Sequence, residues 1–232
     1  TAADLIKKSM VQVQQTLEQT LAQLARQDEL RERISALERE LADAPEQISE
    51  ARRAYEELQA RPQSDPAREQ ADAEIVELEI ILDARNQQLT EWQQELTAAN
   101  SLVINAQTRP ERAQTEISGN QARMQKLQAA LKDDRLDGQA LSAEQRDLLT
   151  AELATLTLSN EFSRRALAGN DTLLDLGSRR RELLTTRIER LEQEILALQE
   201  LINTNPELAG VMGTDQHQAP GAIRAGPRAG HP

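Results

Sequence analysis

Residues 149–202 read LTAELATLTLSNEFSRRALAGNDTLLDLGSRRRELLTTRIERLEQEILALQELI, and this stretch decides the fold. Alternating steps of four and three residues along it reach sixteen positions without a change of phase, and eleven of these are apolar. An apolar period of 3.5 residues is typical of helices that wind against other helices. The remaining chain or a second copy must therefore cover this stripe. The apolar positions are Leu149, Leu153, Leu156, Leu167, Leu174, Leu184, Ile188, Leu191, Ile195, Leu198 and Ile202.

The polar or small interruptions of the stripe gather in its middle. A buried amide at Asn160 or Asn170 costs stability but penalises registers in which it lacks a partner. Each of Gly169 and Gly177 costs about 1 kcal/mol relative to alanine inside a helix. We therefore predict that this helix bends, if anywhere, within residues 160–181. The interruptions of the stripe are Asn160, Ser163, Asn170, Gly177 and Arg181.

Composition favours a helical rod over a globular enzyme. The 232 residues are 38% apolar, 28% charged and 1% aromatic, which suits thin helix seams better than a thick core. The formal charge of −12 argues against nucleic acid as the main partner, because phosphate binding needs a concentrated basic face. The absence of cysteine excludes disulfides and thiolate metal sites.

The rest of the chain supplies two further helical arms. A seam at threes and fours runs through the first arm from Met10 to Leu41, with a wobble at Gln27 and Asp28. Two prolines in residues 61–66 predict a tight reversal, and a polar segment over 132–141 predicts a second one. We expect an all-α fold of elongated antiparallel hairpins, a three-arm coiled coil of one domain over residues 1–204. The predicted arms cover about 4–60, 67–131 and 143–204, and Ser142 with Gln145 forms a capping box for the third.

Two short motifs place proline inside an otherwise continuous seam. Residues 43–46 read DAPE and residues 108–111 read TRPE, and both have the spacing of a helix-capping box with proline in the first turn. Because the seam continues in phase through the first motif, we expect a bend within one arm, with a separate second helix as the alternative. The motif residues are Asp43, Pro45, Glu46, Thr108, Pro110 and Glu111.

Chemistry-bearing residues are sparse. His217 and His231 are the two histidines of the chain, and both lie in a Gly- and Pro-rich tail after residue 204 that we predict to be disordered. We therefore expect no catalytic site and no cofactor. Residues 133–144 match four positions of a calcium loop, but Arg135 places a cation where a ligand should be, so we expect no metal. The matching residues are Asp133, Asp137, Gly138 and Glu144.

No targeting or membrane-spanning segment is visible in the sequence. The first 20 residues have the pattern of an amphipathic helix with Gln, Glu and Lys, which differs from a signal peptide. Purely apolar runs reach only about three residues, far below the roughly 20 needed to cross a bilayer. We therefore expect no membrane span in this chain.

Three segments resemble a known family. They are ADAPE at 42–46, LVINAQTRPERAQ at 102–114 and LAGN at 167–170, and they are similar to the N-terminal periplasmic region of large MscS-type mechanosensitive channels, the "MscS porin" region. The likeness covers roughly residues 5–204. It implies a periplasmic helical rod of an inner-membrane channel that responds to hypo-osmotic stress, with the pore outside this chain. It also implies self-association or contact with other channel subunits, and possible contacts with the cell envelope.

Two functions fit these observations. The first is a non-enzymatic extracytoplasmic domain of such a channel, with a structural, assembly or gating-modulating role. The alternative is a free-standing coiled-coil scaffold or adaptor of the cell envelope. The reading frame after Asn205 separates them, since transmembrane spans there favour the channel and a stop codon favours the scaffold. The heptad pattern fits arms that fold together within one chain, and it equally fits arms that pair between copies of the chain.

Overall fold

Long helices make up almost all of residues 2–204, the part of the chain that this computed structural model describes. The predicted all-α class is confirmed, with one small two-stranded exception. The tail predicted to be disordered, including both histidines, lies outside the described residues. In chain order the elements are α1 (Ala2–Ala60), α2 (Pro66–Glu69), α3 (Ile75–Asp133), β1 (Arg135–Leu136), β2 (Gln139–Ala140), α4 (Ala143–Ala168) and α5 (Asn170–Thr204).

Contacts divide the chain into two compact units. One consists of Thr1–Ala60 with Gln94–Thr185, and the other consists of Arg61–Gln93 with Thr186–Pro232. Both α3 and α5 therefore contribute to each unit. Within residues 2–204, no helix combines the length and the apolar character that a bilayer-spanning segment needs.

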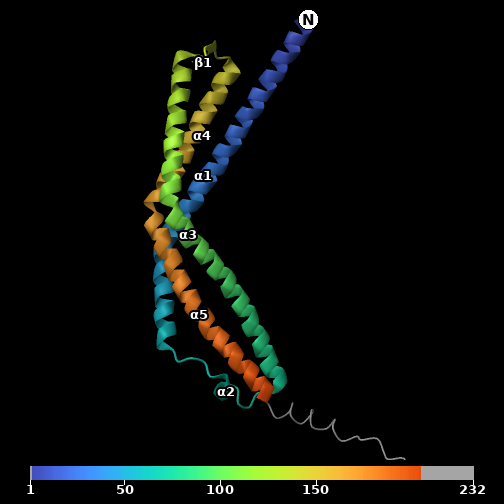
Figure 1. Cartoon of the computed structure of the whole chain (residues 1–232), viewed down its shortest axis with the longest axis vertical. Helices are drawn as coiled ribbons and strands as arrows, with labels where there is room; N and C mark the ends of the chain where they lie inside the picture. Colours follow the sequence, from blue (N-terminus) through green and yellow to red (C-terminus); the bar gives the residue numbers. More distant parts are fainter. Residues whose placement is uncertain (1, 205–232) are drawn as a thin grey trace, which may run out of the picture. The chain divides into compact units, whose positions relative to one another are not determined.

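In the first unit, α1, α3 and α4 alternate in direction, running down, up and down in Figure 1, as expected for antiparallel hairpins. The direction follows from the residue pairs that meet. Along α1 and α4, Gln27 meets Ala151 and Glu38 meets Arg165, so the numbers rise together and the helices are parallel. Along α3 and α4, Arg123 meets Glu152 and Asn120 meets Asn160, so these two helices are antiparallel.

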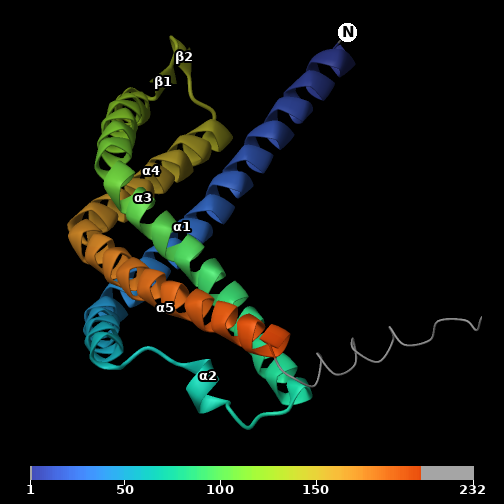
Figure 2. The same cartoon turned by 60° about the horizontal axis from the view of Figure 1, so that its bottom comes forward.

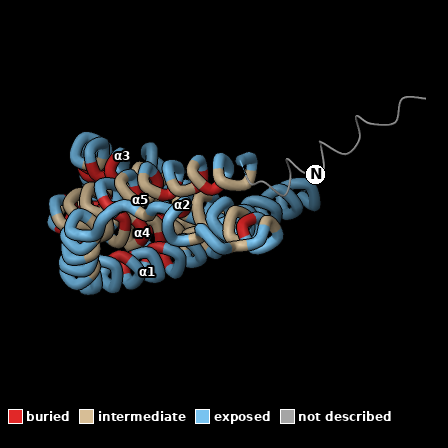
Figure 3. Tube along the Cα trace, turned by 90° about the horizontal axis from the view of Figure 1, so that it is seen from below, coloured by how far each residue is buried: buried red, intermediate tan, exposed pale blue. Residues whose placement is uncertain are grey.

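Leucine and alanine side chains fill the seams of this unit. One cluster joins Leu37 of α1 to Ala166 and Leu173, which are 2% and 0% exposed. A second joins Leu127 of α3 to Leu149 of α4. Burial of each such leucine is worth roughly 1.5–3 kcal/mol. Figure 3 shows the buried positions on the sides where helices face each other.

The second unit pairs the start of α3 with the end of α5. Leu78 and Leu198 are each 1% exposed. Arg85 of α3 forms an ion pair with Glu194 at 2.6 Å. Trp92 is half-buried, and the Arg187 guanidinium lies over its ring at 5.6 Å from the centroid. The burial of Leu184, Ile188, Leu191, Ile195 and Leu198 confirms the periodicity of the sequence in this part of α5.

The first predicted turn was wrong in length. We expected a tight reversal at residues 61–66 and a new arm near Ala67, but α3 begins only at Ile75. Pro66 starts a single helical turn that ends when the Gln70 amide donates to its carbonyl at 2.9 Å. The start of α3 is fixed later, where the Glu74 amide donates to the Glu77 carboxylate at 3.3 Å.

The second turn has more order than the polar segment predicted. Residues 135–140 form a hairpin of two-residue strands. Asp137 and Gly138 take positive φ angles of 49° and 81°. Two-residue hairpin turns require such angles and favour an Asp-Gly pair for that reason. The capping box that follows is confirmed, because Ser142 Oγ accepts from the Gln145 amide at 3.2 Å and Gln145 Oε1 accepts from the Ser142 amide at 2.9 Å.

Both internal prolines lie inside continuous helices. α1 passes through Pro45 and α3 passes through Pro110, so the alternative of a separate second helix is wrong. Asp43 and Thr108 consequently start no helix, and Glu46 and Glu111 lie in helix interiors. The Thr108 hydroxyl instead donates to the Ile104 carbonyl one turn back, at 3.0 Å.

The third arm is interrupted where its sequence is weakest. We predicted one arm over 143–204, and the structure divides it at Gly169 into α4 and α5. The break falls inside the 160–181 segment in which bending was predicted.

Candidate bending site at the junction of α4 and α5

Gly169 and Asn170 form the α4–α5 junction, where the ribbon changes direction (Figure 2). Gly169 has φ −91° and ψ 2°, outside the regular helical values. Its amide still donates to the Arg165 carbonyl at 3.0 Å, and its carbonyl accepts from the Leu173 amide at 3.1 Å. The junction therefore bends the helix while keeping hydrogen bonds on both sides.

Close packing against α1 explains the glycine at this position. A Cβ atom on Gly169 would lie 2.4 Å and 2.6 Å from the two terminal methyls of Leu41. Carbon atoms at van der Waals contact are about 3.5–4.0 Å apart, so any side chain at position 169 would push Leu41 aside. The φ angle of Gly169 is negative, so the absence of a side chain matters more here than backbone freedom.

Asn170 supplies the hydrogen bond that the α3 backbone loses at Pro110. A regular helix would have the amide of residue 110 donate to the Ala106 carbonyl, but proline has no N–H. The Asn170 Nδ2 amide donates to that carbonyl at 2.9 Å. Asn170 is 8% exposed and Ala106 is 1% exposed. A buried carbonyl left without a donor costs roughly 1–3 kcal/mol, so this side chain supplies a bond that the backbone cannot make.

Arg109 fixes which way the Asn170 amide points. Its Nη1 donates to Asn170 Oδ1 at 3.2 Å. Because a guanidinium only donates and a carbonyl only accepts, one amide orientation satisfies both partners. Burial lowers the pKa of the Arg109 guanidinium from its usual value, and the nearby Glu40 carboxylate acts in the opposite direction. Asn170 therefore joins α5 to α3 through both ends of its amide.

Pro45 brings the same kind of irregularity to α1 beside the junction. Its missing N–H would have bonded to the carbonyl of Leu41, the residue whose side chain packs on Gly169. Pro45 also borders an open surface depression together with Asp171 and Thr172 at the start of α5. The irregular positions of all three helices thus lie next to one another: Pro45 in α1, Pro110 in α3 and Gly169 between α4 and α5.

A polar cluster lies along the seam on the α4 side of the junction. The Asn120 Nδ2 amide donates to Asn160 Oδ1 at 2.9 Å and approaches Ser159 Oγ at 3.2 Å. The Glu116 carboxylate accepts from the hydroxyls of Ser159 and Ser163 at 2.7 Å and 3.1 Å. Asn160 and Ser163, two of the interruptions noted in the sequence, therefore have specific partners on α3.

Gly177 permits a close approach of α5 to α3. A Cβ atom there would lie 3.0 Å from Val103 Cγ2 and 3.2 Å from the Val103 backbone nitrogen. Leu173 and Leu176 on the same helix are 0% and 1% exposed. This glycine marks tight packing, whereas the sequence alone suggested a weak point.

The partners of the seam interruptions could not be predicted from the sequence. Ala106, Leu41, Glu116 and Asn120 carry no distinctive signal of their own. One signal was available in the spacing: a proline at position 110 always leaves the carbonyl of residue 106, four residues earlier, without its helical donor. Finding the donor required the register between α3 and α5, which periodicity does not specify.

Among residues 2–204, metal-ligating side chains form no cluster that could hold an ion. Groups of three or more histidine, cysteine or acidic side chains placed for one ion are absent from this part of the chain. The four residues that matched a calcium loop lie on and beside the hairpin, where Asp137 and Gly138 form the turn. The contacts described at the α4–α5 junction are packing contacts and hydrogen bonds.

Comparisons with known proteins show the family to which the chain belongs. Residues 3–205 match the family described as the mechanosensitive ion channel porin domain. The chain is 29% identical over 193 residues to the mechanosensitive channel MscK of Escherichia coli strain K12, covering 83% of this chain and 17% of that protein. It is also 29% identical over 126 residues to an uncharacterized MscS family protein of Haemophilus influenzae, covering 54% of this chain and 11% of the relative. No solved structure gives a significant match. Since the family match spans nearly the whole chain, this protein belongs to the mechanosensitive ion channel porin domain family.

Proposed function

We propose that this chain is a periplasmic coiled-coil domain of a mechanosensitive channel of the inner membrane and that it modulates gating during hypo-osmotic stress. In this proposal the chain holds neither the pore nor a catalytic site, and it acts through a preset bending point at the α4–α5 junction. The family match and the similarity to MscK support a channel-associated role. The chain spans only 17% of the length of MscK, so a pore elsewhere in a longer protein is consistent with this proposal.

The observation that carries the proposal is the shared position of the helix irregularities. A three-helix bundle resists bending because all of its helices must deform together. Pro45 and Pro110 each remove one backbone hydrogen bond from a helix, and Gly169 interrupts the third. When the three irregularities lie side by side, the bundle can bend there with little further loss of hydrogen bonds.

The contacts at the junction give this bend a defined geometry. The Asn170 bond to the Ala106 carbonyl and the Gly169 contact with Leu41 hold α5 against α3 and against α1. A loose hinge would dissipate force, whereas a bend fixed by specific contacts transmits it between the helices on either side. This is the physical basis for a role in modulating gating.

Patch-clamp recording of a full-length channel that carries this domain tests the proposal. Asn170→Ala should shift the membrane tension at which the channel opens while leaving the unitary conductance unchanged, because the pore lies elsewhere. Gly119→Ala, on an open surface of α3, is the matched control and should shift neither quantity. An unchanged opening tension and unchanged survival of osmotic downshock in Asn170→Ala cells, at equal channel abundance, would refute the gating role.

A further inference from the structure

The first part of α1 presents a long apolar stripe that the rest of the described chain does not cover. Leu5, Met10 and Leu21 are 72%, 67% and 65% exposed. In Figure 3 the tube next to the N-terminal label is coloured as exposed. We call residues 5–24 the N-terminal overhang. Its large exposed apolar residues are Leu5, Ile6, Met10, Val11, Val13, Leu17, Leu21 and Leu24.

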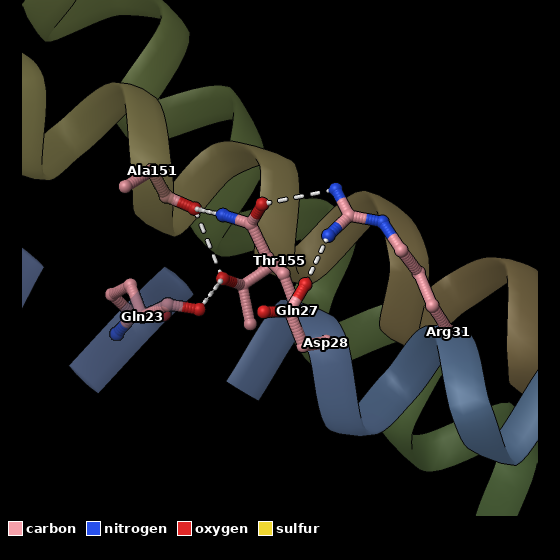
Figure 4. A network of polar contacts seen from close by, with 6 residues as sticks. All are labelled: Gln23, Gln27, Asp28, Arg31, Ala151 and Thr155. Atoms are coloured by element: carbon pink, nitrogen blue, oxygen red, sulfur yellow. Dashed lines mark hydrogen bonds and ion pairs between the residues drawn. The ribbon is translucent and has the colours of Figure 1, made fainter. Parts of the chain in front are cut away.

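The overhang arises from the register between α1 and α4. At the C-terminal end of the overhang, a polar network joins Gln23 and Gln27 of α1 to α4 (Figure 4). Gln27 Nε2 donates to the Ala151 carbonyl at 3.0 Å, and the Thr155 hydroxyl lies 3.3 Å from the Gln23 carbonyl. α4 begins at Ala143, so at this parallel offset most of the overhang extends past the first residue of α4.

The pattern of the overhang identifies the kind of partner that fits it. Ile6, Met10, Val13, Leu17 and Leu24 follow the alternation of fours and threes, with Thr20 completing the series. Farther along the same arm, Leu30, Ile34 and Leu37 are buried, and Leu37 belongs to a cluster with Ala166 of α4. A stripe with a period of 3.5 residues packs best against another helix with the same period.

Charge favours a second copy of this stretch over a membrane surface. Within residues 2–25, Asp4 and Glu18 balance Lys7 and Lys8, whereas the whole chain carries −12. Two such stretches therefore approach each other without net repulsion. Helices that lie on anionic lipid carry a polar face rich in Lys and Arg, but the polar face here is mostly glutamine, as at Gln12 and Gln19.

We propose that the N-terminal overhang docks onto the same stretch of a second copy of this chain. Two helical strips about 30 Å long and about 10 Å wide cover each other over roughly 600 Å² in total. Stable interfaces bury about 1,200–2,000 Å², so this contact is weak between free chains. If several copies are held in one channel, which rests on the proposed function, an effective concentration of about 1 mM is enough to populate it.

Single-cysteine crosslinking tests the contact directly, because the natural chain has no cysteine. Leu17→Cys places a thiol on the stripe, and Gln19→Cys places one on the opposite side of the same helix. At about 1 mM chain, we expect at least about tenfold more disulfide-linked dimer from Leu17→Cys under mild oxidation, since proximity sets the rate. Equal yields from the two variants would overturn the proposal.

Sedimentation equilibrium of the 232-residue chain gives an independent test without cysteines. Met10→Glu with Leu17→Glu should abolish concentration-dependent association, whereas Gln12→Glu with Gln19→Glu adds the same charge on the polar face and should preserve it. Circular dichroism checks that helix content is equal in both. A wild-type chain that stays monomeric at about 1 mM and co-sediments with phosphatidylglycerol–phosphatidylethanolamine vesicles would overturn the proposal in favour of a lipid partner.

These outcomes are separate from those that test the gating role. Crosslinking through Leu17→Cys with no effect of Asn170→Ala on opening tension would support the contact and refute gating. The reverse result would support gating and refute the contact.

Discussion

The α4–α5 junction and the N-terminal overhang share one sequence period but differ in what covers it. At the junction, polar and small residues interrupt the stripe, yet Asn160, Asn170 and Gly177 all lie against α3. In the overhang the stripe is more uniformly apolar, yet its leucines face solvent. Apolar content along a seam therefore does not measure how well that seam is packed.

The comparison indicates which region determines the folding stability of the chain and which determines its association with other chains. Contacts at the junction are specific to single atoms, such as the carbonyl that Pro110 leaves without a donor. Contacts available to the overhang are generic, because any helix of matching period covers leucines in the same way. Substitutions should accordingly affect folding at the junction and association at the overhang.

The largest expected contrast comes from deleting one leucine side chain in each region. Leu173→Ala should lower the free energy of unfolding by about 3 kcal/mol, because it leaves a cavity at a fully buried site. Leu17→Ala, in the overhang, should change it by less than about 0.5 kcal/mol at micromolar chain concentration. Urea titration followed by circular dichroism measures both. Similar losses would mean that the overhang is already covered within one chain.

The second contrast isolates the bond between Asn170 and the Ala106 carbonyl. Asn170→Ala should cost about 2 kcal/mol, because it leaves a buried carbonyl unsatisfied. In a Pro110→Ala background the helix regains its own donor to that carbonyl, so the same substitution should cost clearly less.

Urea titration of the four proteins in this double-mutant cycle gives the coupling energy, which we expect to be about 1 kcal/mol or more. Asn160→Ala is the control, since its partner Asn120 lies away from the proline, and its cost should be the same with Pro110 or with alanine. Strict additivity of Asn170→Ala and Pro110→Ala would contradict the assigned role of Asn170.

Periodicity was enough to predict the long helical arms, the turn signals were enough to predict their alternating directions, and the spacing of Ser142 and Gln145 was enough to predict the cap. The spacing of the apolar residues alone was also enough to predict the seam of residues 184–202. The delayed start of α3 was missed because it depends on a local choice, the Glu77 carboxylate accepting the Glu74 amide, that competes with the proline signal nearby. The hairpin turn at Asp137 and Gly138 had a usable signal in that dipeptide.

The bending site was only half predictable. Gly169 and the two prolines were each noted as irregular from the sequence, but each was considered separately within its own helix. Their meeting depends on the relative register of three helices, and a slide of one heptad keeps every apolar residue on its seam. Polar pairs such as Asn120 with Asn160 distinguish between such registers, and those pairs become visible only in three dimensions.

Hydrogen exchange compares the two regions without any substitution. Amides of residues 160–181 should open at a free energy about 1.5 kcal/mol below that of residues 184–202, because a glycine break and a bent backbone lower the local cost of opening. Amides of the overhang should exchange faster than either segment in dilute solution. Protection across 160–181 equal to that of 184–202 would refute a bending site there.

Two glycine substitutions should give the smallest effects, and these effects should have opposite signs. Gly119→Ala, with open space around the new methyl group, should stabilise the chain by about 0.5–1 kcal/mol through helix propensity. Gly169→Ala gains the same propensity, but its methyl group overlaps Leu41, and overpacking of this kind costs about 1–3 kcal/mol. We therefore expect a net loss of about 1 kcal/mol from Gly169→Ala.

Leu41→Ala separates the two contributions to the Gly169→Ala result. In that background the overlapping methyls are gone, so Gly169→Ala should become neutral or stabilising, while the effect of Gly119→Ala should stay unchanged. Thermal unfolding of the wild-type chain, the three single variants and the two double variants measures these signs. A Gly169→Ala chain that remains destabilised without Leu41 would mean that the junction requires backbone freedom at Gly169, and the contact with α1 would then be a consequence of the bend rather than its cause.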